Sequence, residues 1–304
     1  MGALSYFLGI PFFAPVALVA APLAVCLLAQ RPARRDLVVA GALLAFTALL
    51  LAAGDDGFAQ LERGWVVLLT GSLVIVLAVG RPRGFVTATL AAVGGAAAAA
   101  ALLMGATRLT TAKIAGMAEQ HYFLQTRQLL DLLAPVGSDL RESAQQSIQT
   151  GLAVFGDFLP GIVLLQTLAA LALAWALYQR VAREPEREPL PPLAAFRFND
   201  HLIWGVALSL LVVVLPWLGW ARDLGGNSLV FFGGLYLVRG VAVLAAVAIA
   251  TGFTGAAAYA VAVVGTALLW WLLAPAALLL GLTDTLVDWR LRLARVIQNS
   301  RGQP

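Results

Sequence analysis

Charged residues are scarce in this 304-residue sequence, and residues that hold metals are scarcer still. Asp, Glu, Lys and Arg make up 12% of the chain, against about 25% in ordinary soluble domains. The single cysteine, Cys26, excludes an intrachain disulfide and a cysteine-cluster metal site. The two histidines, His121 and His201, have no neighbours at metal-ligand spacing. We therefore expect no metal site, and a chain whose solvent is lipid rather than water.

Motifs for hydrolytic and nucleotide chemistry are also absent. The sequence has no GxSxG, no HExxH and no Walker-type GxxxxGK[ST] segment. Its glycine pairs at 94–95 and 233–234 lie inside apolar runs, where they favour helix packing rather than phosphate binding. We therefore expect neither an enzyme nor a bound cofactor. If the protein belongs to an ATP-driven machine, the ATPase is a separate chain.

The net charge of +4 comes mainly from arginines beside long apolar runs. A nucleic-acid surface needs a clustered basic face, so nucleic acid is not an expected partner. Arginine-rich loops beside membrane spans face the cytoplasm, which assigns the loops at 31–35, 81–83 and 180–187 to that side. Two predicted spans separate each of these loops from the next. The tail breaks this scheme, because eight simple spans place its arginines on the opposite side: Arg290, Arg292 and Arg295. Two explanations stay open: one segment near the end is re-entrant or doubled, or the tail is an exception to the rule.

Hydrophobic residues make up 61% of the chain and gather in runs that can cross a bilayer as helices. The predicted fold is all-α, an integral membrane helical bundle of about eight transmembrane helices in contact with the lipid bilayer. The N-terminus has no basic region and no convincing cleavage site, so the first run is expected to stay in the protein. The predicted spans are residues 10–28, 37–53, 65–79, 85–104, 161–178, 202–218, 228–251 and 255–282.

Residues 108–155 differ from the rest because they carry charges of both signs among leucines at helical spacing. Two interpretations stay open: amphipathic helices in the membrane interface, or a solvated helical hairpin packed on the bundle. The expected domains are N-terminal transmembrane segments at 1–104, an amphipathic interfacial region at 105–158, a C-terminal transmembrane bundle at 159–283 and an arginine-rich amphipathic tail at 284–304.

One charged residue, Arg239, lies near the middle of the predicted span at 228–251. An arginine at the bilayer centre costs roughly 2.5–3.5 kcal/mol on insertion scales, so the folded protein must compensate for it. Tyr236 lies three residues earlier, on the same helix face. The functional interpretation is an anion-binding or gating charge in a cavity. The structural one is an arginine that snorkels, or that binds helix-end carbonyls or another subunit.

No acidic residue is expected at the same depth as Arg239, because Asp157, Asp200 and Asp284 all lie at the ends of predicted spans. The partner of the arginine is therefore expected to be water, backbone carbonyls, a ligand or a second protein.

Polar residues at the starts of two spans also have two interpretations. Asn199 and Asp200 precede the sixth predicted span, and Asn227 precedes the seventh. Asn and Asp side chains accept hydrogen bonds from the first free amides of a helix, so all three fit N-caps. The alternative is that they contact a ligand or partner together with Arg239.

The tail residues Asp284, Asp288 and Arg292 recur every four positions, which places them on one helical face. The order of Asp288 and Arg292 is the favourable one for an ion pair within a helix. The pattern is typical of a surface ion-pair ladder that closes the last span. The alternative is that these residues and Arg290 form a docking face for a cytoplasmic or membrane partner.

Five short motifs lie in the last third of the chain: FNDHLIW at 198–204, GGN at 225–227, LYLVRG at 235–240, GLTD at 281–284 and VDWR at 287–290. Across residues 196–295 the chain resembles the YybS-like family of multi-pass bacterial membrane proteins. That family is similar to the substrate-binding subunits of energy-coupling-factor vitamin transporters and to the rod-shape membrane protein MreD. The resemblance implies a helical bundle around a central cavity in the bacterial inner membrane. It does not extend to Arg239, where the family more often has an uncharged polar residue.

Two functions are consistent with these features. The first is a transporter-type substrate-binding membrane subunit, with a cavity lined by the last three spans and Arg239 facing it. The second is a structural or scaffold subunit of a larger membrane complex, in which Arg239 and the tail contact other membrane subunits. An intramembrane enzyme is disfavoured because the chain offers no acid–base pair at membrane depth.

Overall fold

The computed structural model is helical throughout the residues that it describes, and no strand occurs among them. The described residues are 14–30, 32–52, 57–80, 82, 84–132, 146, 148, 150–152, 154–253, 255–292 and 295. The start of the first predicted span, residues 133–145 of the amphipathic region and most of the tail lie outside them. The all-α prediction is confirmed for the described part of the chain.

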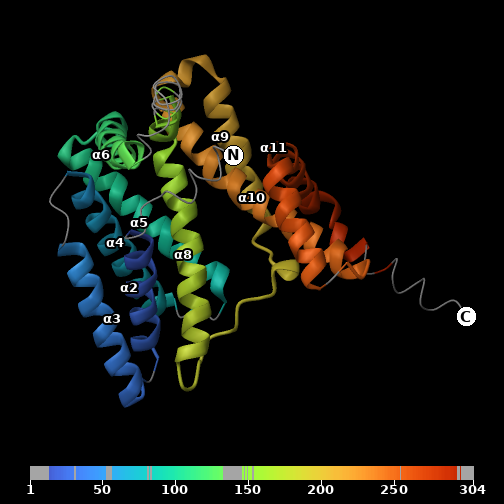
Figure 1. The fold of residues 1–304 in the computed structure, drawn as a ribbon, viewed down its shortest axis with the longest axis horizontal. Helices are drawn as coiled ribbons and strands as arrows, with labels where there is room; N and C mark the ends of the chain where they lie inside the picture. The colour runs from blue at the N-terminus through green and yellow to red at the C-terminus, as the bar shows by residue number, and fades with distance from the viewer. Residues whose placement is uncertain are drawn as a thin grey trace, which may run out of the picture. The chain divides into compact units, whose positions relative to one another are not determined.

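The chain divides into two compact units between Leu190 and Pro191. The predicted domain at 159–283 grouped the fifth span with the C-terminal bundle, whereas this division places α8 in the N-terminal unit. The helices of the N-terminal unit are α2 (Ala14–Leu28), α3 (Arg34–Ala52), α4 (Gly57–Ile75) with the π-helical turn η1 (Val76–Gly80), α5 (Phe85–Thr107), α6 (Thr111–Leu132) and α8 (Leu159–Val181) (Figure 1).

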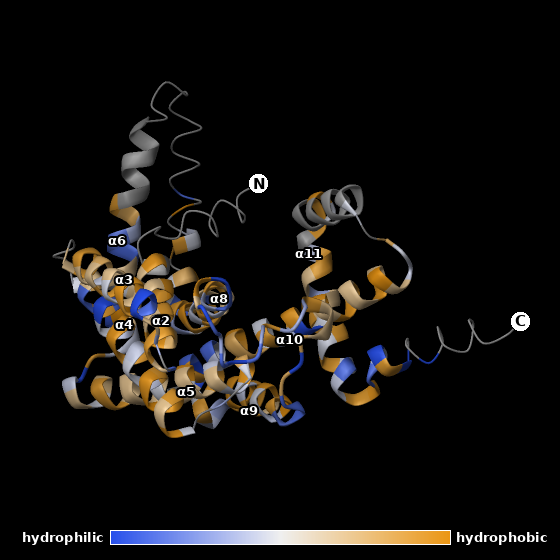
Figure 2. Ribbon diagram, turned by 90° about the horizontal axis from the view of Figure 1, so that it is seen from below, coloured by the Kyte–Doolittle hydropathy of each residue, from blue (hydrophilic) through white to orange (hydrophobic). Residues whose placement is uncertain are grey.

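In the N-terminal unit, α2 is the central helix and packs against α3, α4 and α8. Its residues Ala24 and Leu27 are fully buried. The surrounding helices expose large apolar side chains instead, including Leu49, Val67 and Leu102, and apolar residues run along α4 and α5 in Figure 2. Large exposed apolar surfaces of this kind suit contact with lipid rather than with water.

The amphipathic helix α6 packs on the bundle. Ala118 of α6 is fully buried and forms an apolar cluster with Phe58 of α4 and Leu159 of α8. Tyr122 of α6 lies edge-on to Phe58 and Phe155, with ring centroids 5.5 Å apart in both pairs. A helix held by such contacts is what the interpretation as a packed hairpin expects.

The predicted spans all overlap helices. Among the residues that the structure describes, five helices are long and apolar enough to cross a membrane by length and composition: α3, α4 with η1, α5, α8 and α10 (Arg222–Ala250). The other three predicted spans contain shorter apolar helical segments within the described residues, at Val16–Leu28, Asp200–Val214 and Trp271–Val287, the last being part of the 32-residue helix α11. The structure therefore supports a multi-pass membrane bundle with five full-length candidates.

The sixth predicted span is shorter than expected. Helix α9 covers Ile203–Val214, about 18 Å at 1.5 Å per residue, against a hydrocarbon core of about 30 Å. It ends there because Leu215 is extended, as the residue before Pro216 usually is. The 3-10 helix η4 (Pro216–Ala221) then leads directly into α10, which begins six residues before the predicted start at residue 228.

The C-terminal unit is arranged around the long helix α10. Its first half packs on α9. The contact is close, because a Cβ added at Gly205 of α9 would lie 2.6 Å from the ring of Phe232 in α10. Its second half packs on α11 (Ala256–Val287), where a Cβ at Gly240 would lie 1.7 Å from the Ala277 carbonyl oxygen. The N-terminal end of α9 and the C-terminal end of α11 therefore both reach the middle of α10.

Glycines make the crossing of α10 and α11 possible. A Cβ at Gly281 of α11 would lie 1.9 Å from the carbonyl oxygen of Tyr236 in α10. Together with Gly240, this glycine lets the two backbones touch, in the way that small residues permit close helix contacts in membranes. The crossing places Arg239 of α10 beside the last turns of α11.

Candidate functional site

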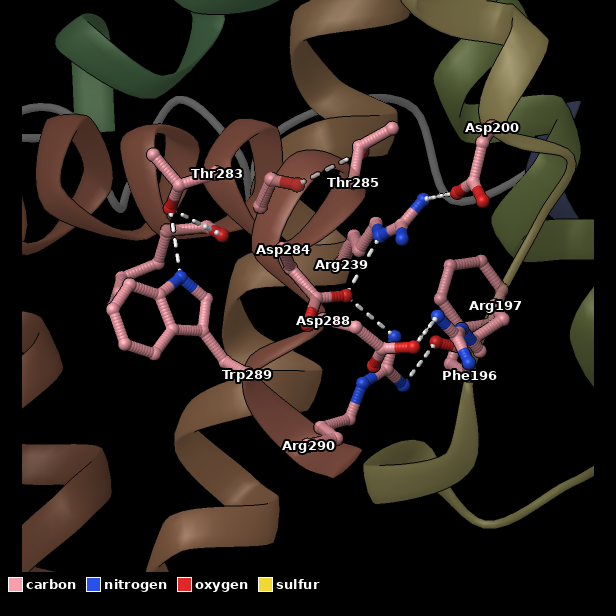
Figure 3. Close-up of polar contacts among 12 residues, drawn as sticks. Phe196, Arg197, Asp200, Arg239, Thr283, Asp284, Thr285, Asp288, Trp289 and Arg290 are labelled. Carbon is pink, nitrogen blue, oxygen red and sulfur yellow. Dashed lines mark hydrogen bonds and ion pairs between the residues drawn. The ribbon is translucent and has the colours of Figure 1, made fainter. Parts of the chain in front are cut away.

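Arg239 is the eighteenth of the 29 residues of α10, and its side chain is fully buried. Its Nε donates a hydrogen bond to Oδ2 of Asp284, 2.9 Å away and also fully buried, near the end of α11. Its Nη1 donates to Oδ1 of Asp200 at 2.6 Å. Asp200 begins the 3-10 helix η3 (Asp200–Leu202) and is 56% exposed. Figure 3 shows the guanidinium between the two carboxylates.

A second arginine shares the buried carboxylate. Arg290 Nη2 donates to Asp284 Oδ2 at 2.8 Å, and Arg290 Nη1 donates to the carbonyl oxygen of Phe196 at 2.8 Å. Beside it, Arg197 pairs with Asp288 at 2.9 Å. We call the six charged side chains the C-terminal charge cluster; its three cations and three anions are Arg197, Arg239, Arg290, Asp200, Asp284 and Asp288.

Aromatic rings cover the buried part of the cluster. The ring centroid of Phe198 lies 5.4 Å from Cζ of Arg239, within the range of a cation–π contact. Tyr236, also fully buried, packs edge-on against Phe198 with ring centroids 5.1 Å apart. Because these rings exclude solvent, the ion pairs act in a low dielectric and are stronger than the same pairs in water.

The cluster is not fully satisfied. Among the described residues, Arg239 Nη2 and Asp284 Oδ1 are buried without a hydrogen-bond partner. A buried polar atom left unpaired costs about 1–3 kcal/mol. Donors and acceptors held in this state are suited to bind a polar group of a ligand.

The expectation that Arg239 lacks acidic partners is wrong. Asp200 and Asp284 lie at helix ends, as predicted, but the ends of α9 and α11 lie beside the middle of α10. The prediction failed because it treated both segments as simple crossings, whose ends would lie far from the centre of a neighbouring span.

Of the three predicted N-caps, the structure confirms one, Asn199. Asn199 caps η3, since its Oδ1 accepts a hydrogen bond from the backbone N of His201 at 3.0 Å. Asp200 is not a cap, because its carboxylate binds Arg239. Asn227 is not a cap either, because α10 begins at Arg222. Its side-chain nitrogen donates to the carbonyl oxygen of Asp223 one turn earlier, at 2.9 Å.

The predicted ladder of tail residues is wrong as well. Asp288 adopts a left-handed conformation with φ of 50°, so the helical face that was to carry Asp284, Asp288 and Arg292 is interrupted. Asp284 turns to Arg239 and Arg290, and Asp288 turns to Arg197. Arg292 is exposed, and the role of these residues in docking a partner stays a prediction.

Sequence reasoning did not identify Arg197, Phe198, Gly240 or Gly281 as parts of the site. Arg197 and Phe198 directly precede Asn199 and Asp200. Their position beside two candidate site residues could have indicated that they belong to the site. Gly240 follows Arg239, and Gly281 lies one turn before Asp284. Those spacings signal close helix contacts next to charged residues.

The contacts of Arg290 predict the side of the membrane on which the tail starts. Arg290 binds the carbonyls of Ala194 and Phe196, which follow the arginine-rich loop without an intervening span. Residues 194–196 and 290 must therefore lie on one side, so the three helices between them make an even number of crossings. We expect the short helix α9 to be the one that does not cross, because it has 12 residues.

We expect single cysteines at Arg183 and Arg292, in a Cys26→Ser background, to react with a membrane-impermeant maleimide from the same side. A cysteine at Arg108 provides the opposite-side control, because one predicted span separates it from the loop at 81–83. Labelling of Arg183→Cys and Arg292→Cys from opposite sides would show that the three helices make an odd number of crossings.

Within the part of the chain that the structure describes, no group of three or more His, Cys, Asp or Glu side chains is placed to hold a metal ion. No curated protein and no solved structure matches the chain. A family model described as "Predicted membrane protein (DUF2232)" matches residues 3–285. This match includes Asp200, Arg239 and Asp284 but ends before Asp288 and Arg290. Since it covers nearly the whole sequence, the chain belongs to the DUF2232 family of predicted membrane proteins.

Proposed function

We propose that this membrane protein is a transporter-type substrate-binding subunit of the bacterial inner membrane, with its ligand bound at the C-terminal charge cluster. The observation that carries the proposal is the fully buried Arg239, whose Nη2 has no hydrogen-bond partner among the described residues. Ionisable groups inside membrane proteins usually mark sites of ligand or ion handling. The resemblance to the YybS-like family implies a helical bundle around a central cavity, which suits this role, but it implies no ligand.

The arrangement of helix ends supports the same function. In many transporters, interrupted helices end at a binding site inside the membrane, where their free backbone groups and dipoles face the ligand. Here η3 and α9 begin beside Arg239, and α11 ends beside it. In this mechanism Arg239 contacts the ligand, and Asp284 holds the guanidinium in position through Nε. Asp200, which is half exposed, is the partner that can leave.

A scaffold subunit of a larger membrane complex is the second candidate, and the charge balance of the cluster favours it. Three cations face three anions, so the cluster needs no ligand to become neutral. In this role the cluster would fix α9, α10 and α11 relative to one another and present an outer surface to partner subunits. Buried ion pairs that specify one arrangement are a known use of such networks.

Purification in nanodiscs followed by mass spectrometry of everything that co-purifies tests the two functions. We expect a retained small molecule, or a co-purifying ATPase, with the wild-type protein. The molecule should be lost from Arg239→Gln and kept by Arg222→Gln, which changes an exposed arginine at the start of the same helix. Added ligand at 100 times its Kd should stabilise the wild type by about 2.7 kcal/mol. Other membrane proteins in fixed stoichiometry, with no small molecule, would favour the scaffold instead.

A further inference from the structure

The guanidinium of Arg239 presents two edges to its surroundings, and neither is fully committed, because Nη2, which belongs to both edges, has no partner among the described residues. A guanidinium offers five N–H groups, and a carboxylate can take two of them along either its Nε/Nη2 edge or its Nη1/Nη2 edge. Asp284 holds Nε at 2.9 Å and is itself fixed by Arg290. On the other edge, Asp200 accepts one hydrogen bond, from Nη1, and Nη2 has no partner among the described residues.

Asp200 and Asp284 differ in how firmly they are held. Asp284 is fully buried and accepts hydrogen bonds from two arginines. Asp200 is 56% exposed, stands at the start of a three-residue 3-10 helix, and has one ion pair. The Nη1/Nη2 edge of Arg239 is thus half occupied, by the carboxylate that is easier to displace and that faces the outside of the unit.

We propose that a ligand carboxylate of single negative charge displaces Asp200 and accepts hydrogen bonds from both Nη1 and Nη2 of Arg239. This inference rests on the proposed function and names the chemical class of its ligand. Two parallel hydrogen bonds to a guanidinium are stronger and more specific than the one that Asp200 makes. The exchange also leaves Nη2 satisfied, which removes an unpaired buried donor.

Charge balance determines the valence of the ligand. When Asp200 turns out into solvent and a ligand carboxylate replaces it, the guanidinium keeps the same number of negative charges in direct contact, and the cluster as a whole gains the single charge of the ligand. A dianionic group, such as a phosphate monoester, would add an uncompensated negative charge next to the fully buried Asp284. Such a charge is costly in a low dielectric. The site is therefore expected to select carboxylates over phosphates.

Chemical rescue with formate tests this inference without knowledge of the natural ligand. Asp200→Ala removes the exposed carboxylate and leaves the Nη1/Nη2 edge open. We expect sodium formate to raise the Tm of detergent-purified Asp200→Ala saturably, and more than equal concentrations of sodium chloride or sodium phosphate. The wild type should need a higher formate concentration for the same shift, because Asp200 competes. Asp223→Ala, which removes an exposed carboxylate from the first turn of α10, is the matched control and should respond like the wild type.

If Asp200→Ala does not fold, Asp200→Asn preserves the size of the side chain and allows the same titration. An equal response of all proteins to formate, or a response of Asp200→Ala to phosphate as large as to formate, would overturn the inference. The formate titration and the nanodisc purification can give different answers, so failure of the ligand class can be told from failure of the proposed function. Specific rescue by formate in a protein that purifies without a ligand contradicts only the transport role. A co-purifying molecule without a carboxylate, together with failed rescue, contradicts only the ligand class.

Discussion

Alanine at Gly240 or Gly281 is expected to destabilise the C-terminal unit strongly, because the added methyl group would meet backbone atoms of the neighbouring helix. The added Cβ would lie 1.7 Å from the Ala277 carbonyl oxygen or 1.9 Å from the Tyr236 carbonyl oxygen. Both obstacles are backbone atoms, which cannot move aside as a flexible side chain can. Overpacking typically costs about 1–3 kcal/mol, and we expect these variants at or above the upper end. The measurement is the Tm of the purified variants in detergent.

Gly233→Ala supplies the matched control on the same helix. A Cβ at Gly233 would meet nothing within 4 Å, so its Tm should equal or exceed that of the wild type, because alanine favours a helix over glycine by about 1 kcal/mol. Equal Tm values for Gly240→Ala, Gly281→Ala and Gly233→Ala would mean that α10 and α11 do not cross at these glycines.

Loss of either buried partner in the Arg239–Asp284 pair is the second large expected effect. Asp284→Leu leaves Arg239 buried with only the exposed Asp200, and Arg239→Met leaves Asp284 with only Arg290. Removal of one partner from a buried ion pair costs roughly 3–5 kcal/mol, because the remaining charge stays out of water. The free energy of unfolding, from denaturant titration in mixed micelles, should fall by this amount for each single variant.

Asp223→Leu serves as the control for Asp284→Leu, since it removes an exposed carboxylate and adds the same apolar side chain. Its free energy of unfolding should stay within about 0.5 kcal/mol of the wild type. A loss for Asp284→Leu no larger than that of this control would show that the carboxylate is not buried against Arg239.

Much of the fold follows from composition and the lengths of apolar runs. Helices α3, α4, α5 and α8 each overlap a predicted span, because a run of apolar residues in lipid must satisfy its backbone as a helix. Boundaries were less predictable. Helix α10 extends back to Arg222 through polar residues, including Asn227, that the hydrophobic pattern placed outside the span.

The sequence identified the central residue of the site, Arg239, but not the residues that contact it. A lone arginine in an apolar run marks Arg239 without knowledge of the fold. Its partners depend on the crossing of α10 and α11 and on the early end of α9 before Pro216. Both are tertiary features, and hydrophobic periodicity does not report which helix ends meet the middle of another helix. The left-handed Asp288 likewise broke a four-residue spacing that looked regular in the sequence.

The most direct test of the account is a double-mutant cycle between Arg239 and Asp284, which measures their interaction in the folded protein. If the two side chains form the buried pair on which the candidate site is built, the double variant Arg239→Met with Asp284→Leu should be less destabilised than the sum of the single variants. The difference should be roughly 2 kcal/mol or more. Single effects that add within about 0.5 kcal/mol would contradict the pair, and with it the site proposed around Arg239.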